Sequence, residues 1–542
     1  MKAFAGTLRL FRLALRLERV RLPIWIVANV GIIALTLPQL ITTYDTVAKR
    51  LIYTTTSSSS AVTRLLNGAL AGPEMGNIAV VETFFLAAIL FALMNIFLIT
   101  RHTRLEEETN RSEVIGSTLV GRQAGLTAAL LLALITNAVS AALIFLVFRL
   151  NNLPFDGSLA YSLALGLMGM VFAGVAAVTA QLFENTRTAN SLAGLIFGLA
   201  FLVRGIGDVL GQLKPGGLGV TPNFLSWFSP VGWVLNINAF TAERWYVLPM
   251  FGVLSVVLVA AAYVLLSTRD VGAALFAPKP GKAHASPTLL RRFGLIWRLN
   301  RTSTISWGLA IISFGGVIGA VAHEFSKLIE SNEEMQEALR QLGAGTNVTD
   351  VLFGFTFIIM AIAVCAYALQ TLTRMRTEES SGRLELLFST AESRYSWLFN
   401  YTVYALVTAA IILGLTGLMA GLVYGVVAGD VAGNIKTLTA AIMVYVPAIC
   451  VMMGAALGFF GVVPRFFVAL VWASLASSLT IFQLGAILKM PQWILNLSPF
   501  LHTPTAPIVD VRLKPLLLLS LVAISLCTAG FILFRRRDIQ TS

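Results

Sequence analysis

Long apolar runs alternate with short polar segments along the whole of this 542-residue chain. Runs of about 20 apolar residues can cross a ~30 Å hydrocarbon core as helices. They do not show the strict polar–apolar alternation of β-barrel strands. The pattern predicts an all-α polytopic membrane protein with about twelve transmembrane helices. The expected spans are 23–41, 79–99, 124–148, 159–182, 191–210, 247–267, 305–322, 351–372, 400–425, 437–463, 466–488 and 515–534.

The first 21 residues, "MKAFAGTLRLFRLALRLERVR", form a different kind of segment. Their apolar residues are interrupted by arginines, whereas a cleavable signal peptide has an unbroken apolar centre. The spacing predicts an amphipathic cytoplasmic arm that lies at the membrane surface.

Composition and charge placement support this topology. Hydrophobic residues make up 57% of the chain, the mean hydropathy is +0.81 and the net charge is +13. With both termini in the cytoplasm, the cytoplasmic segments hold 26 Lys and Arg against 12 acids, and the remainder holds 13 against 14. Because positive charge is retained on the inside, the basicity follows the membrane topology and does not indicate nucleic-acid binding.

Cysteine and histidine give no sign of a metal site or a disulfide framework. Cys365, Cys450 and Cys527 all fall within predicted spans, where a thiol behaves as a small apolar group. The four histidines are scattered, so we expect no metal ligands and no cofactor bound by this chain.

Two polar segments stand out because they match each other. The segments 104–122 and 376–394 are identical at eight of nineteen positions. We call them coupling segments 1 and 2. The matched pairs are Arg104/Arg376, Glu106/Glu378, Glu107/Glu379, Arg111/Arg383, Glu113/Glu385, Ser117/Ser389, Thr118/Thr390 and Arg122/Arg394.

Further landmarks recur in the same order, so the chain is predicted to contain two copies of a six-span unit. Six spans return the chain to its starting side, which predicts parallel repeats. The expected domains are 1–274, a cytoplasmic linker 275–294, and 295–542. The recurring landmarks are Trp25/Trp307, Ser229-Pro230/Ser498-Pro499 and Arg269-Asp270/Arg537-Asp538.

Each coupling segment is predicted to form a short amphipathic helix beneath the membrane. Glu107 precedes Arg111 by four residues, and Glu379 precedes Arg383 by four, an order that favours helical ion pairs worth ~0.2–0.5 kcal/mol each. We expect the apolar face to rest on the bundle and the carboxylates to face the cytosol. The alternative is a solvated loop whose charges only keep it out of the bilayer.

Each half is a six-span unit with a Glu-rich segment after its second span and a Ser-Pro pair before its last span. This order of features resembles the type-2 permeases of ABC exporters, in which the Glu-rich segment is a coupling helix seated in the ATPase subunit. The doubled form resembles the bacterial permeases described as tetronasin and polyketide antibiotic exporters. Departures are Ser380 where copy 1 has Glu108, and Gly382 where it has Asn110. The resemblance implies coupling roles for Glu106, Glu107, Arg111, Glu113, Glu378, Glu379, Arg383 and Glu385.

The resemblance also implies an ATP-driven exporter of lipophilic compounds in the bacterial plasma membrane. Separate ATPase subunits, expected as two copies, would power it. No G-x-x-x-x-G-K-[ST] motif occurs, and Gly281-Lys282 lacks the surrounding pattern. ATP and Mg²⁺ would therefore be bound by the partner, and the chain itself is not expected to be an enzyme. The alternatives are a secondary transporter driven by an ion gradient, and a lipid-modifying membrane enzyme.

Four polar residues inside spans are weaker candidates for substrate or gate contacts: Arg204, Asp208, Glu82 and Asn95. A charge within a span usually faces the bundle interior or a cavity. For Arg204 and Asp208, four residues apart, the favoured interpretation is a local ion pair. The segments 45–70 and 323–343 are expected to form external helices.

Overall fold

The computed structural model describes residues 3–270, 272–276, 284, 286–287, 289, 292–330, 348–389, 393–484, 490–509 and 511–538. Internal contacts divide the chain into two compact units, Met1–Gly281 (unit 1) and Lys282–Ser542 (unit 2). The division falls inside the segment 275–294, which the sequence pattern predicts to be a linker. Each unit is described by itself.

The predicted fold class is confirmed, because the described residues contain eleven helices that are long and apolar enough to cross a membrane. The predicted span 466–488 corresponds to a shorter apolar helix, and residues 485–489 lie outside the described ranges. The eleven segments are Arg21–Thr43, Met75–Glu108, Ala124–Leu150, Phe155–Leu182, Thr186–Val209, Val247–Thr268, Phe293–Ala322, Thr349–Ser380, Arg394–Ala428, Val431–Val462 and Leu513–Arg536.

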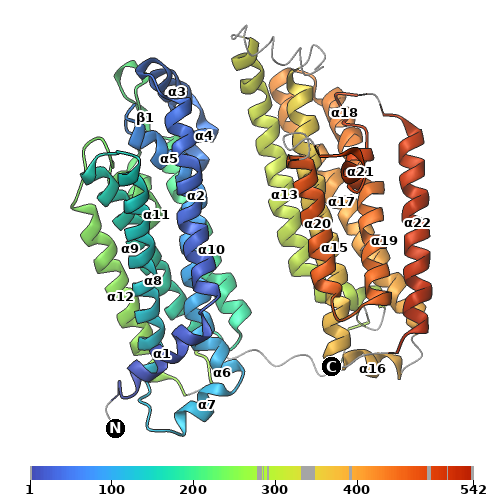
Figure 1. Cartoon of the computed structure of the whole chain (residues 1–542), viewed down its shortest axis with the longest axis horizontal. Coiled ribbons are helices and arrows are strands. Elements are labelled where there is room, and N and C mark those ends of the chain that lie inside the picture. The colour runs from blue at the N-terminus through green and yellow to red at the C-terminus, as the bar shows by residue number, and fades with distance from the viewer. Residues whose placement is uncertain are drawn as a thin grey trace. The chain divides into compact units, whose positions relative to one another are not determined.

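In unit 1 the long helices lie side by side, and short elements gather at both ends of the bundle (Figure 1). β1 and β2 form a two-stranded antiparallel hairpin. The elements are α1 Thr7–Leu17, α2 Arg21–Thr43, α3 Val47–Ser59, α4 Ala61–Leu66, α5 Met75–Thr100, the π-helix η1 Arg101–Leu105, α6 Glu106–Glu108, α7 Arg111–Gly116, α8 Ala124–Leu150, α9 Phe155–Leu182, α10 Thr186–Val209, β1 Gln212–Leu213, η2 Pro215–Gly217, β2 Val220–Thr221, η3 Phe224–Phe228, α11 Pro230–Asn236 and α12 Val247–Thr268.

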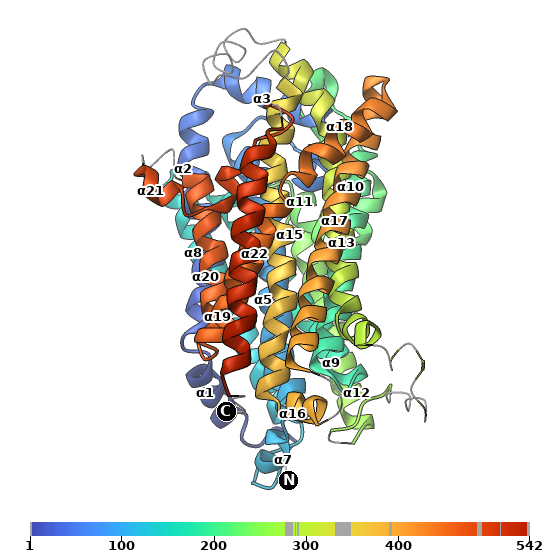
Figure 2. The same ribbon diagram turned by 90° about the vertical axis from the view of Figure 1, so that its right-hand side faces the viewer.

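Unit 2 is also a helical bundle, and Figure 2 shows its short helix α16 at the end of α15. Its elements are α13 Arg292–Glu330, α15 Val348–Ser380, α16 Arg383–Phe388, α17 Arg394–Ala428, α18 Val431–Met443, α19 Val446–Val462, α20 Phe467–Leu484, α21 Gln492–Leu495, η4 Pro499–His502 and α22 Leu513–Arg536.

Two spans of unit 2 differ from their predicted form. The span 437–463 consists of α18 and α19, and Pro447 lies in the first turn of α19. Proline has no amide donor, so the first turn of a new helix accommodates it where a helix interior would not. α13 continues unbroken from Arg292 to Glu330. The predicted external helix 323–343 therefore begins as an extension of this span, and its residues 331–343 lie outside the described ranges.

The interior of unit 1 is formed by α5 and α9, which bury residues on all sides. Two side-chain amides pair reciprocally inside it. Asn95 Nδ2 donates to Asn137 Oδ1 at 3.0 Å, and Asn137 Nδ2 donates to Asn95 Oδ1 at 2.7 Å. A Cβ at Gly169 would lie 2.2 Å from Asn137 Oδ1. Glycine at this position of α9 therefore makes room for the amide pair between α5 and α8.

Glycines let two helices of unit 2, α18 and α13, pack closely against α17. A Cβ added to Gly417, Gly421 or Gly425 would lie 2.6–2.7 Å from an α-carbon of α18. A Cβ at Gly315 or Gly319 of α13 would lie 2.6–2.8 Å from carbonyl oxygens of α17. Small residues at four-residue spacing are a common means of close packing between membrane helices.

We predict that Gly421→Ala destabilises unit 2, because the added methyl group would meet the α-carbon of Ile435 at 2.6 Å. Overpacking of this kind costs about 1–3 kcal/mol. The matched control is Gly414→Ala on the same helix, where the nearest atom is a methionine sulfur at 3.8 Å.

Unfolding in detergent can be followed by the alkylation of Cys365, which is fully buried in the folded protein. The melting temperature should fall for Gly421→Ala and remain near the wild-type value for Gly414→Ala. Equal melting temperatures for the two variants would contradict the packing account.

Candidate functional site

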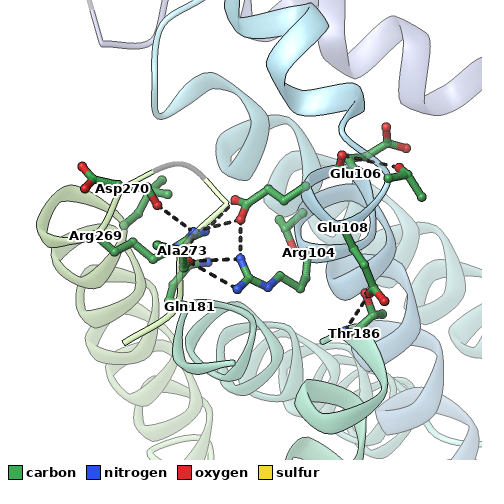
Figure 3. A network of polar contacts seen from close by, with 12 residues as sticks. Arg104, Glu106, Glu108, Gln181, Thr186, Arg269, Asp270 and Ala273 are labelled. Carbon is green, nitrogen blue, oxygen red and sulfur yellow. Dashed lines mark hydrogen bonds and ion pairs between the residues drawn. The ribbon is translucent and has the colours of Figure 1, made fainter. Parts of the chain in front are cut away.

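The candidate site of unit 1 lies where the α5 rod ends in coupling segment 1. The rod continues through one π-helical turn, η1, into α6, which carries Glu107. Arg269 follows the last turn of α12, and its guanidinium meets the Glu107 carboxylate with both terminal nitrogens, at 2.8 and 2.5 Å. Arg104 contacts the same carboxylate from one turn earlier. We call this Arg–Glu–Arg triad clasp 1 (Figure 3).

Further hydrogen bonds connect clasp 1 to the neighbouring helix ends. Arg269 Nε donates to Gln181 Oε1 at the end of α9, at 2.9 Å. Arg104 and Arg269 both donate to the carbonyl oxygen of Ala273. Arg122, just before α8, donates to the carbonyl oxygen of Leu266 at 2.9 Å and to that of Arg269. Clasp 1 therefore ties coupling segment 1 to the ends of α9 and α12.

Unit 2 repeats the triad at the matched positions. Arg537 Nη2 lies 2.9 Å from Glu379 Oε2, and Arg376 Nη1 lies 3.0 Å from the same oxygen. Arg394, the counterpart of Arg122, donates to the Arg537 carbonyl oxygen at 2.8 Å. The Arg537 guanidinium also lies 4.6 Å from the centre of the Phe460 ring, a cation–π contact. We call Arg376, Glu379 and Arg537 clasp 2.

Electrostatics explain why the clasps are tight. Each places one carboxylate between two guanidinium groups, and charge-assisted hydrogen bonds are the strong class of protein hydrogen bonds. Arg104 is 1% exposed and Glu379 is 0% exposed, so water screens these pairs poorly. A buried pair of this kind contributes little over apolar packing, but losing one partner leaves an uncompensated charge.

Each coupling segment turns sharply just after its clasp glutamate. Asn110 and Gly382 occupy matched positions and both have positive φ angles, 58° and 72°. Asparagine and glycine are the residues that adopt this left-handed conformation most readily. After the turn, Arg111 lies 3.8 Å from Glu106, and Arg383 lies 3.8 Å from Glu378.

This turn overturns the predicted pairing of Glu107 with Arg111 and of Glu379 with Arg383. A left-handed residue ends the helix between the partners, so the four-residue spacing no longer brings them together. The carboxylates of Glu107 and Glu379 point into the bundle. The sequence pattern predicts instead that they face the cytosol, so this prediction is wrong. Glu113 and Glu385 are exposed, as predicted.

The prediction that the apolar face of each coupling helix rests on the bundle is wrong for unit 1. Val114 is 73% exposed and Leu119 is 82% exposed. In unit 2 Leu386 of the predicted face is 73% exposed and Leu387 is half-buried, while Leu384, two residues before Leu386, is fully buried. Each coupling segment therefore combines a buried clasp with apolar side chains that no part of the described chain covers.

A relative of known name matches nearly the whole chain. The "Multidrug efflux system permease protein Rv1217c" of Mycobacterium tuberculosis is 34% identical over 538 residues, which cover 99% of this chain and 96% of the relative. The chain belongs to this multidrug efflux permease family. The family model described as "Multidrug efflux system permease Rv1217c, C-terminal domain" matches residues 289–535. This match includes Arg376 and Glu379 of clasp 2 and ends just before Arg537.

The other polar candidates of the permease lie apart from the clasps. Arg204 and Asp208 form the local pair, at 3.2 Å, and both are 0% exposed. Arg204 also donates to the carbonyl oxygens of Arg64 and Leu66, at 3.2 and 3.1 Å. Its guanidinium lies 4.1 Å from the centre of the Phe201 ring. The pair fastens α10 to the end of α4 and has no open face for a substrate.

Glu82 and Asn95 also have partners within unit 1. The hydroxyl of Tyr53, on α3, donates to Glu82. Burial raises the pKa of Tyr53, and the neighbouring Glu82 carboxylate raises it further, so the hydroxyl keeps its proton. Asn95 is paired with Asn137 and is 0% exposed, which gives it a packing role. The structure therefore does not bring Arg204, Asp208, Glu82 and Asn95 together into one site.

Sequence reasoning missed the contact between the clasp residues. The sequence pattern marks Arg269 and Arg537 only as repeat landmarks and predicts no role for Gln181. A usable signal was present, since an arginine three residues before each clasp glutamate and another at the end of each sixth span recur in both halves. Two cations that recur with one anion in a membrane protein indicate a buried ionic cluster.

We predict that Glu107→Gln destabilises the permease, because Arg104 and Arg269 would keep their charges without a carboxylate. Removing one partner of a buried ion pair costs about 3–5 kcal/mol. The control is Glu113→Gln, which alters an exposed carboxylate of the same segment and should change stability by no more than about 0.5 kcal/mol. Melting temperatures from tryptophan fluorescence in detergent provide the comparison. Similar stability for the two variants would show that clasp 1 does not hold the segment.

Proposed function

We propose that this permease is the membrane subunit of an ATP-driven type-2 ABC exporter, with separate ATPase subunits docked on its two coupling segments. The observation that carries the proposal is the repetition of the clasp. In each unit an Arg–Glu–Arg triad fixes the coupling segment to the end of the last membrane helix. Such an attachment suits a segment that receives force from a partner and passes it to the bundle.

The exposed side chains of the coupling segments fit a docking surface. Val114 and Leu119 in unit 1 and Leu386 in unit 2 are apolar and largely exposed. Val114 and Leu386 each lie three residues after an arginine of the same short helix, Arg111 and Arg383, whose side chains are 69% and 65% exposed. An apolar centre with a charged rim is the usual anatomy of a protein interface. The partner would bind ATP and Mg²⁺, because this sequence lacks a phosphate-binding loop motif.

The proposed mechanism is alternating access driven by nucleotide. Two ATPase subunits, one on each coupling segment, would close on ATP and favour one arrangement of the helices over another. Nucleotide can shift this equilibrium only if the docked subunits bind the two arrangements with different affinities. Because clasp 1 joins the end of the α5 rod to α12 and clasp 2 joins α15 to α22, movement of either segment would displace two membrane helices at once.

For the cargo we propose lipophilic compounds, in keeping with the multidrug efflux named for the relative. The setting we propose is the bacterial plasma membrane, with both termini in the cytoplasm, as the excess of Lys and Arg in the cytoplasmic segments favours. This orientation places both coupling segments where an ATPase subunit can reach them.

We predict that Val114→Asp combined with Leu386→Asp releases the ATPase subunit. A carboxylate cannot be buried in an apolar contact without a partner, so co-purification of a co-expressed ABC ATPase should fall about tenfold or more. ATP-dependent uptake of lipophilic dyes into inside-out vesicles should fall in parallel. The matched control is Val47→Asp combined with Leu213→Asp, which alters exposed apolar residues of α3 and β1 at the opposite end of unit 1 (Figure 1).

Two results would overturn the proposal. In one, the Val114→Asp/Leu386→Asp variant retains both the ATPase and the dye uptake of the wild type. In the other, the purified permease alone transports dye under a proton or sodium gradient, which would make it a secondary transporter.

A further inference from the structure

The amphipathic helix α1 presents two parallel strips on its exposed surface. Arg9, Arg12 and Arg16 follow the spacing of one face of α1, Arg19 lies two residues after its end, and all four are exposed. In the described part of the chain none of them forms an ion pair. The opposite side of α1 is anchored to unit 1, because Ala14 is 5% exposed and belongs to the core.

The second strip is apolar and runs beside the arginines. Leu8 and Leu15, two turns apart on α1, are 68% and 38% exposed, and Phe4 just before the helix is 53% exposed. A helix with a cationic strip beside an apolar strip is typical of segments that lie in the interfacial region of a bilayer. Only three residues separate α1 from α2, so this surface stays at the end of a membrane span.

Both ends of the arm are fastened around coupling segment 1. At its start, Gly121 N donates to the Ala5 carbonyl oxygen at 2.9 Å, and Gln123 N donates to that of Ala3 at 3.0 Å. At its end, the 2% exposed carboxylate of Glu18 lies 3.0 Å from Arg101 of η1.

His102, the next residue of η1, lies 3.2 Å from the same carboxylate. Burial raises the pKa of Glu18, but the neighbouring His102 and Arg101 side chains more than offset this, so its pKa lies below the ordinary value and the carboxylate stays charged. The arm is thus anchored on both sides of α6 and α7.

A cavity of about 650 Å³ separates the middle of the arm from coupling segment 1. Leu10, Leu13 and Leu17 line it from α1, and Glu106 and Ser112 line it from the segment. The arm is therefore bonded to Gly121 at the end of the segment and to Arg101 and His102 just before its start, with the cavity between these two attachments. A force on α1 would reach the segment through the backbone bonds to Gly121 and Gln123 and through Glu18.

We propose that the exposed face of α1 binds the headgroups of anionic phospholipids, and that lipid charge thereby acts on coupling segment 1. Each basic residue near an anionic membrane surface strengthens binding about fivefold, and the apolar strip adds burial at the acyl boundary. An acidic protein surface would match the arginines but would leave Leu8 and Leu15 uncovered. The lipid contact stands by itself, whereas the effect on coupling rests on the proposed function.

The lipid contact can be tested with the full chain in nanodiscs and without any ATPase. An environment-sensitive fluorophore is attached at Leu8→Cys, in a background in which Cys365, Cys450 and Cys527 are replaced by alanine. Discs of phosphatidylcholine alone are compared with discs that also contain phosphatidylglycerol. The emission should shift to shorter wavelength in the anionic discs, because the strip moves into the apolar boundary.

The variant Arg9→Gln/Arg12→Gln/Arg16→Gln should lose this shift in emission. Each arginine that is removed weakens the binding of α1 to the anionic membrane surface about fivefold, so little electrostatic attraction remains. The matched control Lys436→Gln/Arg512→Gln/Lys514→Gln removes three exposed cations near the starts of α18 and α22 and should keep the full shift. Identical emission in the two kinds of disc would overturn the lipid contact. A shift that appears only when the ATPase subunit is added would assign the face to a protein and would equally overturn it.

The effect on coupling has a separate readout. In discs that hold the permease with its ATPase, the hydrolysis rate should change with phosphatidylglycerol content in the wild type and not in the triple arginine variant. If the fluorescence shift occurs and hydrolysis is the same in both kinds of disc, α1 binds lipid without acting on the segment. If no ATPase associates at all, the proposed function fails while the fluorescence result still stands.

Discussion

The burial of one carboxylate between two guanidinium groups is the interaction on which the account of both units depends. Glu107 and Glu379 hold the end of a long central helix against the end of the last membrane helix. The ion pairs are largely withdrawn from water, so each carboxylate is hard to remove once its arginines are in place. This arrangement converts a polar loop into a fixed part of the bundle. The apolar side chains beyond the turn are then left facing outward.

The two units use the same triad with different local support. Clasp 1 adds Gln181 from α9 and the carbonyl oxygen of Ala273, whereas clasp 2 sets Arg537 over an aromatic ring. In unit 1 a π-helical turn carries Arg104 of the clasp, whereas in unit 2 α15 runs through to Ser380 without such a turn. The coupling segments are therefore held by a shared ionic core, and their surroundings have diverged.

Much of the fold could be predicted from sequence, because apolar length and cationic asymmetry directly reflect the thickness and charge of a bilayer. The points at which helices end, and the side-chain contacts that result, could not be predicted as well. A four-residue spacing from Glu107 to Arg111 favours an ion pair only while the helix continues, and the left-handed conformation of Asn110 ends it. Likewise, the presence of Asn95 in a predicted span does not show that its side-chain amide forms hydrogen bonds with Asn137 of another helix. Such contacts depend on which helices become neighbours, which spacing along one chain does not encode.

The central claim is that the clasps transmit movement from the coupling segments to the membrane helices. The most direct measurement compares ATP hydrolysis with dye transport in vesicles that contain the permease and the proposed ATPase subunit, for the wild type and for Glu107→Asp/Glu379→Asp. Aspartate keeps the charge but is one methylene shorter, so it loosens each clasp without discharging it. The account predicts that hydrolysis continues while the number of dye molecules moved per ATP falls. An unchanged transport ratio in this variant would contradict it.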